Sequence, residues 1–428
     1  MSRSYILLLS LLLSCPCLAQ KDEIIKTGWN FGPLPVIGFD SDLGFQYGLC
    51  CDIFNFGDGS NYPVYDYKIN VEASTYTKGS SILRTYGDFK TLIPDGKLFF
   101  DITYFNAPKF GFYGFNGFAQ KYDPDKIAWY PSATPSNDAK SGYNLMSKNQ
   151  FRVMASVSKE IAGNLSAAAG VAFYHITTDR LDISDYDGQY TLFDEYVSKG
   201  LIRENEKNGG NVTQFRAGLV YDTRDHDSDP TSGENIEASL VYSPDLIDGN
   251  GYSNLGLFLC MSQYRSIFSD RLTFAYRFLV QSNLWGEIPY WFTNNINSMF
   301  FRKLYTEAIG GNASVRGLNR NGVLGQGIVM VNGEIRWRIY DFKFINQNWQ
   351  IAANPFFDAG QVIQSYRLDE QKAAGLHSGN DDGIHCTAGA GFKLVMNHNM
   401  VLSFEAAKAL DKNDGNGLWT NIGFNYLF

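Results

Sequence analysis

The chain has 428 residues, a formal net charge of −8 and 15% aromatic residues, with 42 glycines but only 13 prolines. The negative charge argues against a nucleic-acid partner, and beyond the first nineteen residues no apolar run reaches the roughly 20 residues that a membrane helix requires. An abundance of tyrosine, phenylalanine and glycine is typical of membrane β-barrels, which use aromatic girdles and tight turns.

The first residues have the features of a secretory signal peptide. Arg3 supplies a positive charge, residues 5–13 are almost wholly apolar, and Ala19 ends a small-residue site at which we expect cleavage. A lipoprotein signal ending before Cys15 is the alternative, although the residues on either side of that cysteine fit it poorly. We therefore predict an exported protein with a signal peptide over residues 1–19.

From about residue 33 to the end, apolar residues alternate with polar or small ones, which is the period of a β-strand. Leu98, Phe100 and Ile102, for example, would face away from Asp101 and Thr103. A soluble β-sandwich also alternates, but these strands are about ten residues or longer, enough to cross a membrane when tilted. The recurring charges on the polar face indicate a wet lumen inside a wall that contacts lipid.

Turn signals divide this region into about 16 strands. Their expected starts are Leu34, Phe45, Asp66, Ser80, Lys97, Lys148, Leu165, Thr213, Asn235, Tyr252, Arg271, Gly327, Trp349, Ile384, Met400 and Leu418. The tight turns fall at one end and the long connections at the other, as in bacterial barrels with short periplasmic turns. The sheet must close, because lipid cannot satisfy a free edge. We predict an all-β, 16-stranded antiparallel transmembrane barrel over residues 34–428, after a short N-terminal segment over residues 20–33.

The last residues carry a separate pattern. Ile422, Phe424, Tyr426 and Phe428 alternate up to a terminal aromatic residue. This ending looks like the recognition signal of outer-membrane barrels, whereas the simpler interpretation is only a last strand. We predict that Phe424, Tyr426 and Phe428 form such a barrel signal.

Three further segments resemble the BamA/TamA family of outer-membrane assembly barrels, also called bacterial surface antigens. They are residues 310–318, with the sequence Val315-Arg316-Gly317 inside a long loop, residues 221–233, and the pair 332–336 and 356–360. Leu318 departs from the aromatic residue usual at that position in the family. The resemblance implies an extracellular loop folded back into the barrel, eleven strands before it and five after it, and a weak seam between the first and last strands.

The residues themselves suggest how such a loop would be held. Alternation places Glu334 and Arg336 on one face of a strand, and Asp358 on the same face of the next. A guanidinium on an inward loop could then bond both carboxylates, and Arg316, beside Val315 and Gly317, is the candidate. We predict a latch that partly fills the pore; alternatively, Glu334 and Arg336 pair with lumen neighbours and Arg316 is solvated.

Other charged residues have simpler interpretations. Asp222 and Arg224 would face inward and balance lumen charges. Asp225, Asp227 and Asp229 could suggest calcium, but they lack the spacing and closing glutamate of a known loop, so a solvated turn is favoured. The cysteine spacing shows no zinc pattern. We predict no metal and no cofactor.

The chain contains no Gly-x-Ser-x-Gly elbow, no phosphate-binding loop and no His-Glu-x-x-His motif. A triad built from distant residues is the one catalytic alternative, and we predict that the protein is not an enzyme. The region between the signal peptide and the first strand is too short for the periplasmic POTRA modules of BamA-like proteins, so we expect a member that lacks them.

The resemblance implies a role in the assembly, insertion or translocation of outer-membrane proteins in a Gram-negative bacterium. The alternative is a narrow channel, or a scaffold for other envelope proteins, because fold-level analogy does not fix function. The expected partners are the lipid bilayer, lipopolysaccharide, and client barrels or periplasmic and surface accessory proteins.

Overall fold

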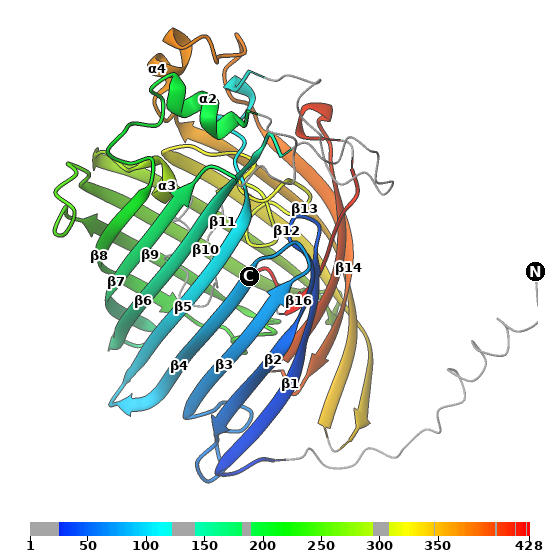
Figure 1. The fold of residues 1–428 in the computed structure, drawn as a ribbon. Helices are drawn as coiled ribbons and strands as arrows, with labels where there is room; N and C mark the ends of the chain where they lie inside the picture. Colours follow the sequence, from blue (N-terminus) through cyan, green and yellow to red (C-terminus); the bar gives the residue numbers. More distant parts are fainter. Residues whose placement is uncertain are drawn as a thin grey trace, which may run out of the picture.

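The computed structural model describes residues 25–121, 142–181, 190–293, 308–345, 347–398, 400–415, 417–424 and 426–428. The predicted signal peptide lies outside these residues. Within them, sixteen antiparallel strands form a closed barrel in which neighbours in sequence pair and β1 meets β16 (Figure 1). The predicted 16-stranded antiparallel barrel is confirmed.

The strand bounds follow the predicted starts closely. They are β1 (Trp29–Asp40), β2 (Gly44–Asn55), β3 (Tyr67–Tyr76), β4 (Ser81–Ile93), β5 (Gly96–Gly111), β6 (Leu145–Ala162), β7 (Leu165–Asp179), β8 (Gly209–Asp222), β9 (Gly233–Ser243), β10 (Asn254–Ile267), β11 (Ser269–Gly286), β12 (Gly327–Phe344), β13 (Gln347–Gln364), β14 (His385–Met396), β15 (Met400–Ala409) and β16 (Trp419–Phe424). Eleven of the described strands precede the loop that carries Arg316, and five follow it.

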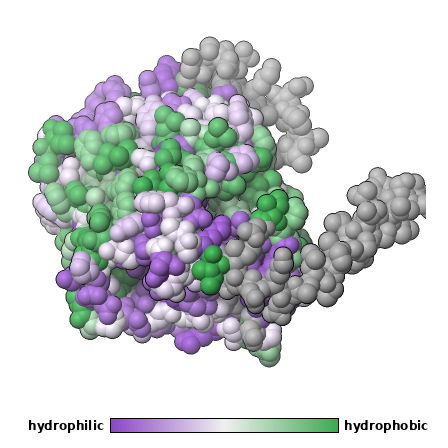
Figure 2. All heavy atoms as spheres, turned by 90° about the horizontal axis from the view of Figure 1, so that it is seen from below, coloured by the Kyte–Doolittle hydropathy of each residue, from purple (hydrophilic) through white to green (hydrophobic). Residues whose placement is uncertain are grey.

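The two faces of the sheet differ as the alternation predicts. Outward side chains such as Phe31 and Leu49 are about 70% exposed, at 69% and 72%, whereas inward ones such as Asp101 and Arg152 are fully buried. Apolar exposure on this scale is unfavourable in water but suits a wall in lipid. Figure 2 views the molecule from the end with the short turns, and hydrophilic residues gather toward the centre of this face.

Several buried charges on the inner face are paired across neighbouring strands. Asp101 of β5 accepts hydrogen bonds from Arg84 of β4 at 2.8 Å and from Arg152 of β6 at 2.7 Å. Because an unpaired buried charge is strongly unfavourable, cross-strand ion pairs of this kind let the lumen wall carry charge at little loss of stability.

The two ends of the barrel are unlike. Short turns lie at one end, and the long connections form a cap at the other, with the helices α2 (Leu192–Ser198), α3 (Tyr290–Thr293) and α4 (Leu368–Ala373) (Figure 1). Within the cap, Phe115 packs edge-on against Tyr196 of α2 and against Tyr366, with ring centroids 4.9 and 4.8 Å apart. Such contacts stabilise a dry core at this end. None of the helices in the described ranges is long and apolar enough to cross a membrane.

Two boundaries differ from the sequence predictions. β1 begins at Trp29, so the segment 20–33 is shorter than predicted and the barrel does not start at Leu34. The prediction missed the first residues of β1 because this strand contains two prolines, and proline usually marks an edge or a strand end. β16 ends at Phe424, so the predicted alternation to Phe428 is wrong: Phe424 is exposed, whereas Tyr426 is buried and lies against lumen side chains.

Candidate functional site in the barrel lumen

The loop between β11 and β12 carries a fully buried arginine. Arg316 donates from Nε and Nη2 to the two carboxylate oxygens of Asp358 on β13, at 2.8 and 3.0 Å. Its Nη1 donates to Glu334 on β12 at 3.1 Å. Its backbone N–H also donates to Asp358, at 3.1 Å. The two-pronged contact with Asp358 fixes the guanidinium plane, which a lysine at this position could not do.

Two partners of Arg316, and a lysine that shares one of them, were missed from the sequence. Glu405 of β15 accepts from Nη1 at 2.8 Å and also from Lys393 of β14 at 2.6 Å. The ring of Phe356 lies 3.6 Å from the guanidinium carbon, a cation–π contact. Phe356 stands two residues before Asp358 on the same face of β13, so alternation was the available signal. Glu405 and Lys393 depend on how β13, β14 and β15 align, which no local pattern reveals.

The site is balanced in charge. Its cations are Arg316, Arg336 and Lys393, and its anions are Glu334, Asp358 and Glu405. Arg336 donates from Nε to Glu334 at 2.7 Å rather than to the loop. Every member therefore has an opposite charge beside it, as burial in a region of low dielectric constant requires.

Two glycines let the loop approach the wall. Gly317 has a φ of 101°, and a Cβ there would come within 3.0 Å of Ala407 and 3.2 Å of Thr387. A Cβ on Gly360 of β13 would lie 3.1 Å from a methyl group of Val315. Any larger residue would push the loop from the strands, which explains the glycines beside Arg316 and Asp358. The structure thus brings the predicted residues together, while their role as a latch stays a prediction.

The same loop reaches the seam between β1 and β16. Arg320 pairs with Asp40 at the end of β1, and its backbone N–H donates to Asp42 at 2.7 Å. Asn312 donates to Asn421 of β16 at 3.5 Å. One loop therefore contacts both strands of the seam at the long-loop end, besides contacting the wall through Arg316.

The family model of the Omp85 superfamily domain matches residues 68–426. The chain belongs to the Omp85 superfamily. Solved structures similar to it include BamA from Haemophilus ducreyi lacking POTRA domains 1-3, at 14% identity and a TM-score of 0.56, covering 94% of this chain and 70% of that one.

CdiB from Escherichia coli is also similar, at 11% identity and a TM-score of 0.57, covering 93% of this chain and 63% of that one. At these sequence identities, the similarity of this chain to BamA and CdiB concerns the fold alone. Among curated proteins, none matches the chain. The predicted BamA-like barrel is confirmed as a family assignment.

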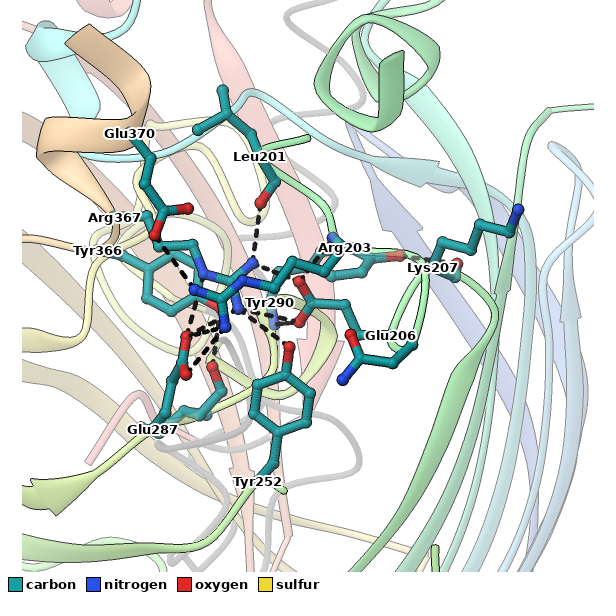
Figure 3. Close-up of polar contacts among 12 residues, drawn as sticks. Leu201, Arg203, Glu206, Lys207, Tyr252, Glu287, Tyr290, Tyr366, Arg367 and Glu370 are labelled. Atoms are coloured by element: carbon teal, nitrogen blue, oxygen red, sulfur yellow. Dashed lines mark hydrogen bonds and ion pairs between the residues drawn. The ribbon is translucent and has the colours of Figure 1, made fainter. Parts of the chain in front are cut away.

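A second polar cluster ties the cap of this Omp85 barrel together (Figure 3). Arg367, which precedes α4, pairs with the fully buried Glu206 and with Glu287, and donates to the carbonyl of Leu201 at 2.8 Å. Arg203 lies beside it and contacts Glu287 at 2.8 Å. Three separate long connections meet at this point. No sequence signal marked these residues, because each lies in a loop without periodicity.

The remaining predicted charges of the Omp85 barrel pair locally. Arg224 contacts both oxygens of Asp222, at 2.9 and 2.8 Å, although Arg224 lies in the turn after β8 rather than on the strand. Of the acidic residues considered for calcium, Asp225 accepts from Thr231, Asp227 pairs with Lys90, and Asp229 contacts His398. They point to different partners, and no metal-binding group of three occurs in the ranges that the structure describes.

Asp42 gives the seam a dependence on pH. Burial, and then the neighbouring Asp40, raise the pKa of Asp42 to about 6, against the opposing effect of Arg320. The folded state therefore retains this proton over a range in which the unfolded state has lost it. The contribution of the protonated Asp42 carboxyl to the stability of the folded barrel is present below the ordinary pKa near 4. This contribution is lost as pH rises through about 6. We expect wild-type melting temperature to fall, relative to Asp42→Asn, between pH 4 and pH 7. Parallel melting curves for the two proteins would contradict this.

Proposed function

We propose that this Omp85 barrel is a non-enzymatic protein of a Gram-negative outer membrane that inserts or translocates other proteins. The observation that carries the proposal is the seam. β1 pairs with β2 at twelve positions, but with β16 at only Phe39 and Asp40 among the described residues. Few hydrogen bonds must break to part these two strands, whereas parting any ordinary pair would break a full ladder.

The lumen supports the same proposal. The cap packs around a buried apolar cluster, and Arg316 of the loop bonds to lumen residues of the wall, so both protein segments occupy part of the interior. A constitutive pore would not need a buried plug. A barrel that opens at its wall does, because the plug keeps the membrane sealed while the wall parts.

The proposed partners are lipid and lipopolysaccharide around the wall, client barrel proteins at the seam, and accessory proteins that deliver them. The fold alone does not select the clients. The alternative of a narrow channel or scaffold predicts that the seam stays shut throughout the working cycle.

A disulfide across the seam tests the proposal. Phe39 and Ile422 face each other in the register, so Phe39→Cys with Ile422→Cys should cross-link, and both substitutions leave the Arg320–Asp40 contact intact. The native Cys50, Cys51, Cys260 and Cys386 are replaced first, because all four are free thiols.

In the native host, oxidation of the engineered cysteine pair should then lower the amounts of specific outer-membrane proteins. Reduction of the disulfide should restore these amounts. The control is the same pair of substitutions kept reduced. An outer-membrane proteome that stays unchanged when the seam is cross-linked would contradict the proposal. If size-graded solute leakage from liposomes responds to the variants instead, the channel alternative is favoured.

A further inference from the structure

The seam ends early along β1. Beyond Phe39 and Asp40, residues 29–38 of this strand form no β-sheet pair with β16 among the described residues, although β16 continues to Phe424. Backbone N–H and C=O groups without hydrogen-bond partners are unfavourable in lipid. An unpaired strand edge of this length therefore needs a structural explanation.

Hydrogen bonding shows which residues point toward that edge. Gly28 bonds to the β2 side, since it accepts from Phe56 and donates to Gly57. Successive residues of a strand point their backbone groups to alternate sides, so the odd-numbered residues of β1 point toward β16. Contacts at the long-loop end of the seam agree with this assignment. The Thr420 N–H donates to the Ser41 hydroxyl at 2.9 Å, and this hydroxyl donates to the Thr420 C=O at 3.0 Å.

Two of these odd-numbered positions are prolines. Continuing the register from Phe39 and Ile422 would place Pro35 opposite Tyr426 and Pro33 opposite Phe428. Proline has no N–H to donate. Two hydrogen bonds of a continued ladder could therefore not form, and both losses fall in the half of the seam near the short turns.

The same barrel shows what one such proline does. Pro355 of β13 pairs with Ala390 of β14. On its other side the ladder with β12 jumps from the pair Glu334 and Phe356 to the pair Trp337 and Ala353, without the two pairs between them. A single proline thus interrupts a ladder whose strands are both held in the sheet.

Tyr426 and Phe428, which follow β16, contact side chains in the lumen. The Tyr426 ring lies 4.0 Å from the guanidinium carbon of Arg336, and Arg336 Nη2 donates to the carbonyl of Phe428 at 2.7 Å. Lys393 lies 5.1 Å from the Tyr426 ring. Arg336 and Lys393 both belong to the lumen site, so the residues after β16 join the network that holds Arg316.

We propose that Pro33 and Pro35 set the length of the seam. They prevent pairing in its short-turn half and release Tyr426 and Phe428 to contact Arg336 and Lys393 in the lumen. The seam is thereby closed at the long-loop end, through Ser41 and Arg320, and open at the other. This assignment holds whatever the barrel transports, because it concerns only how β1 and β16 pair.

The test is amide hydrogen exchange, read by mass spectrometry on the barrel in lipid nanodiscs. The variant Pro33→Val with Pro35→Val should let the ladder continue, since valine supplies the N–H and favours strands. Exchange in the segments 29–38 and 422–428 should slow by about tenfold or more, because paired amides open less often. Pro355→Val is the matched control and should leave both segments unchanged.

The proposal is overturned if exchange in both segments stays at the wild-type rate, or if Pro355→Val slows it equally. If the double variant fails to fold, Pro35→Val alone decides the matter. It should protect the amides around Tyr426, and an unprotected Tyr426 region in a folded single variant would equally overturn the proposal.

Discussion

Replacing Arg316 with alanine is expected to destabilise the barrel by about 3–5 kcal/mol, the range for removing one partner of a buried ion network. Asp358 would lose both of its guanidinium contacts, and three buried carboxylates would share the charges of Arg336 and Lys393. The loop would leave the wall and the lumen would take up water. Urea unfolding in liposomes and planar-bilayer conductance measure the two effects.

Two companions make this test specific. Arg316→Lys keeps the charge but loses the two-pronged contact, so it should recover only part of the stability. Arg271→Ala removes an ion pair with Asp341 whose side chains are 52% and 40% exposed, and such surface pairs contribute about 0–1 kcal/mol. A latch role is ruled out if Arg316→Ala matches Arg271→Ala in unfolding and leaves conductance at the wild-type level.

Replacing Arg367 with alanine is expected to open the cap. The fully buried Glu206 would lose its main cation, while the carbonyl of Leu201 and the hydroxyl of Tyr252 would lose a donor. Removing one partner from a buried pair destabilises by about 3–5 kcal/mol, so the open population of the cap should rise about a hundredfold or more. Proteolysis of the long connections in intact cells or proteoliposomes follows that population.

Arg180→Ala serves as the control for the cap. Arg180 approaches Asp194 at 3.6 Å with a side chain that is 54% exposed, so its loss should change proteolysis little. Equal cleavage of the two variants would show that the Arg367 cluster does not hold the cap closed. Cleavage that rises without any gain in conductance would show that the Arg316 loop seals the lumen independently.

The barrel was predictable because alternation acts over many residues. Strand starts such as Gly327 and Met400 coincide with the predicted ones, since each wall residue either contacts lipid or fills the lumen. The same alternation placed Glu334 and Asp358 on one face. The choice of Arg316 as their partner came from the resemblance to BamA-like loops, and the residues alone left a solvated arginine open.

The missed features depend on relations between distant segments. Glu405 reaches Arg316 only because the closed sheet sets β15 near β13 across β14. The cluster around Arg367 depends on the packing of three loops, which has no period to detect. The inward turn of Tyr426 depends on prolines nearly four hundred residues earlier, which become relevant only when β1 and β16 meet.

The spacing of the Arg316 contacts along the chain imposes an order on folding. Its partners lie 18, 42 and 89 residues later, and the farthest, Glu405, is on the strand just before the closing one. A growing sheet that ends at β13 can satisfy only part of the guanidinium. Because long-range contacts form late, seating of the loop and closure of the cylinder should occur together as the final step of biogenesis. The Arg316 loop is therefore fully bonded only when the sheet is about to become a barrel.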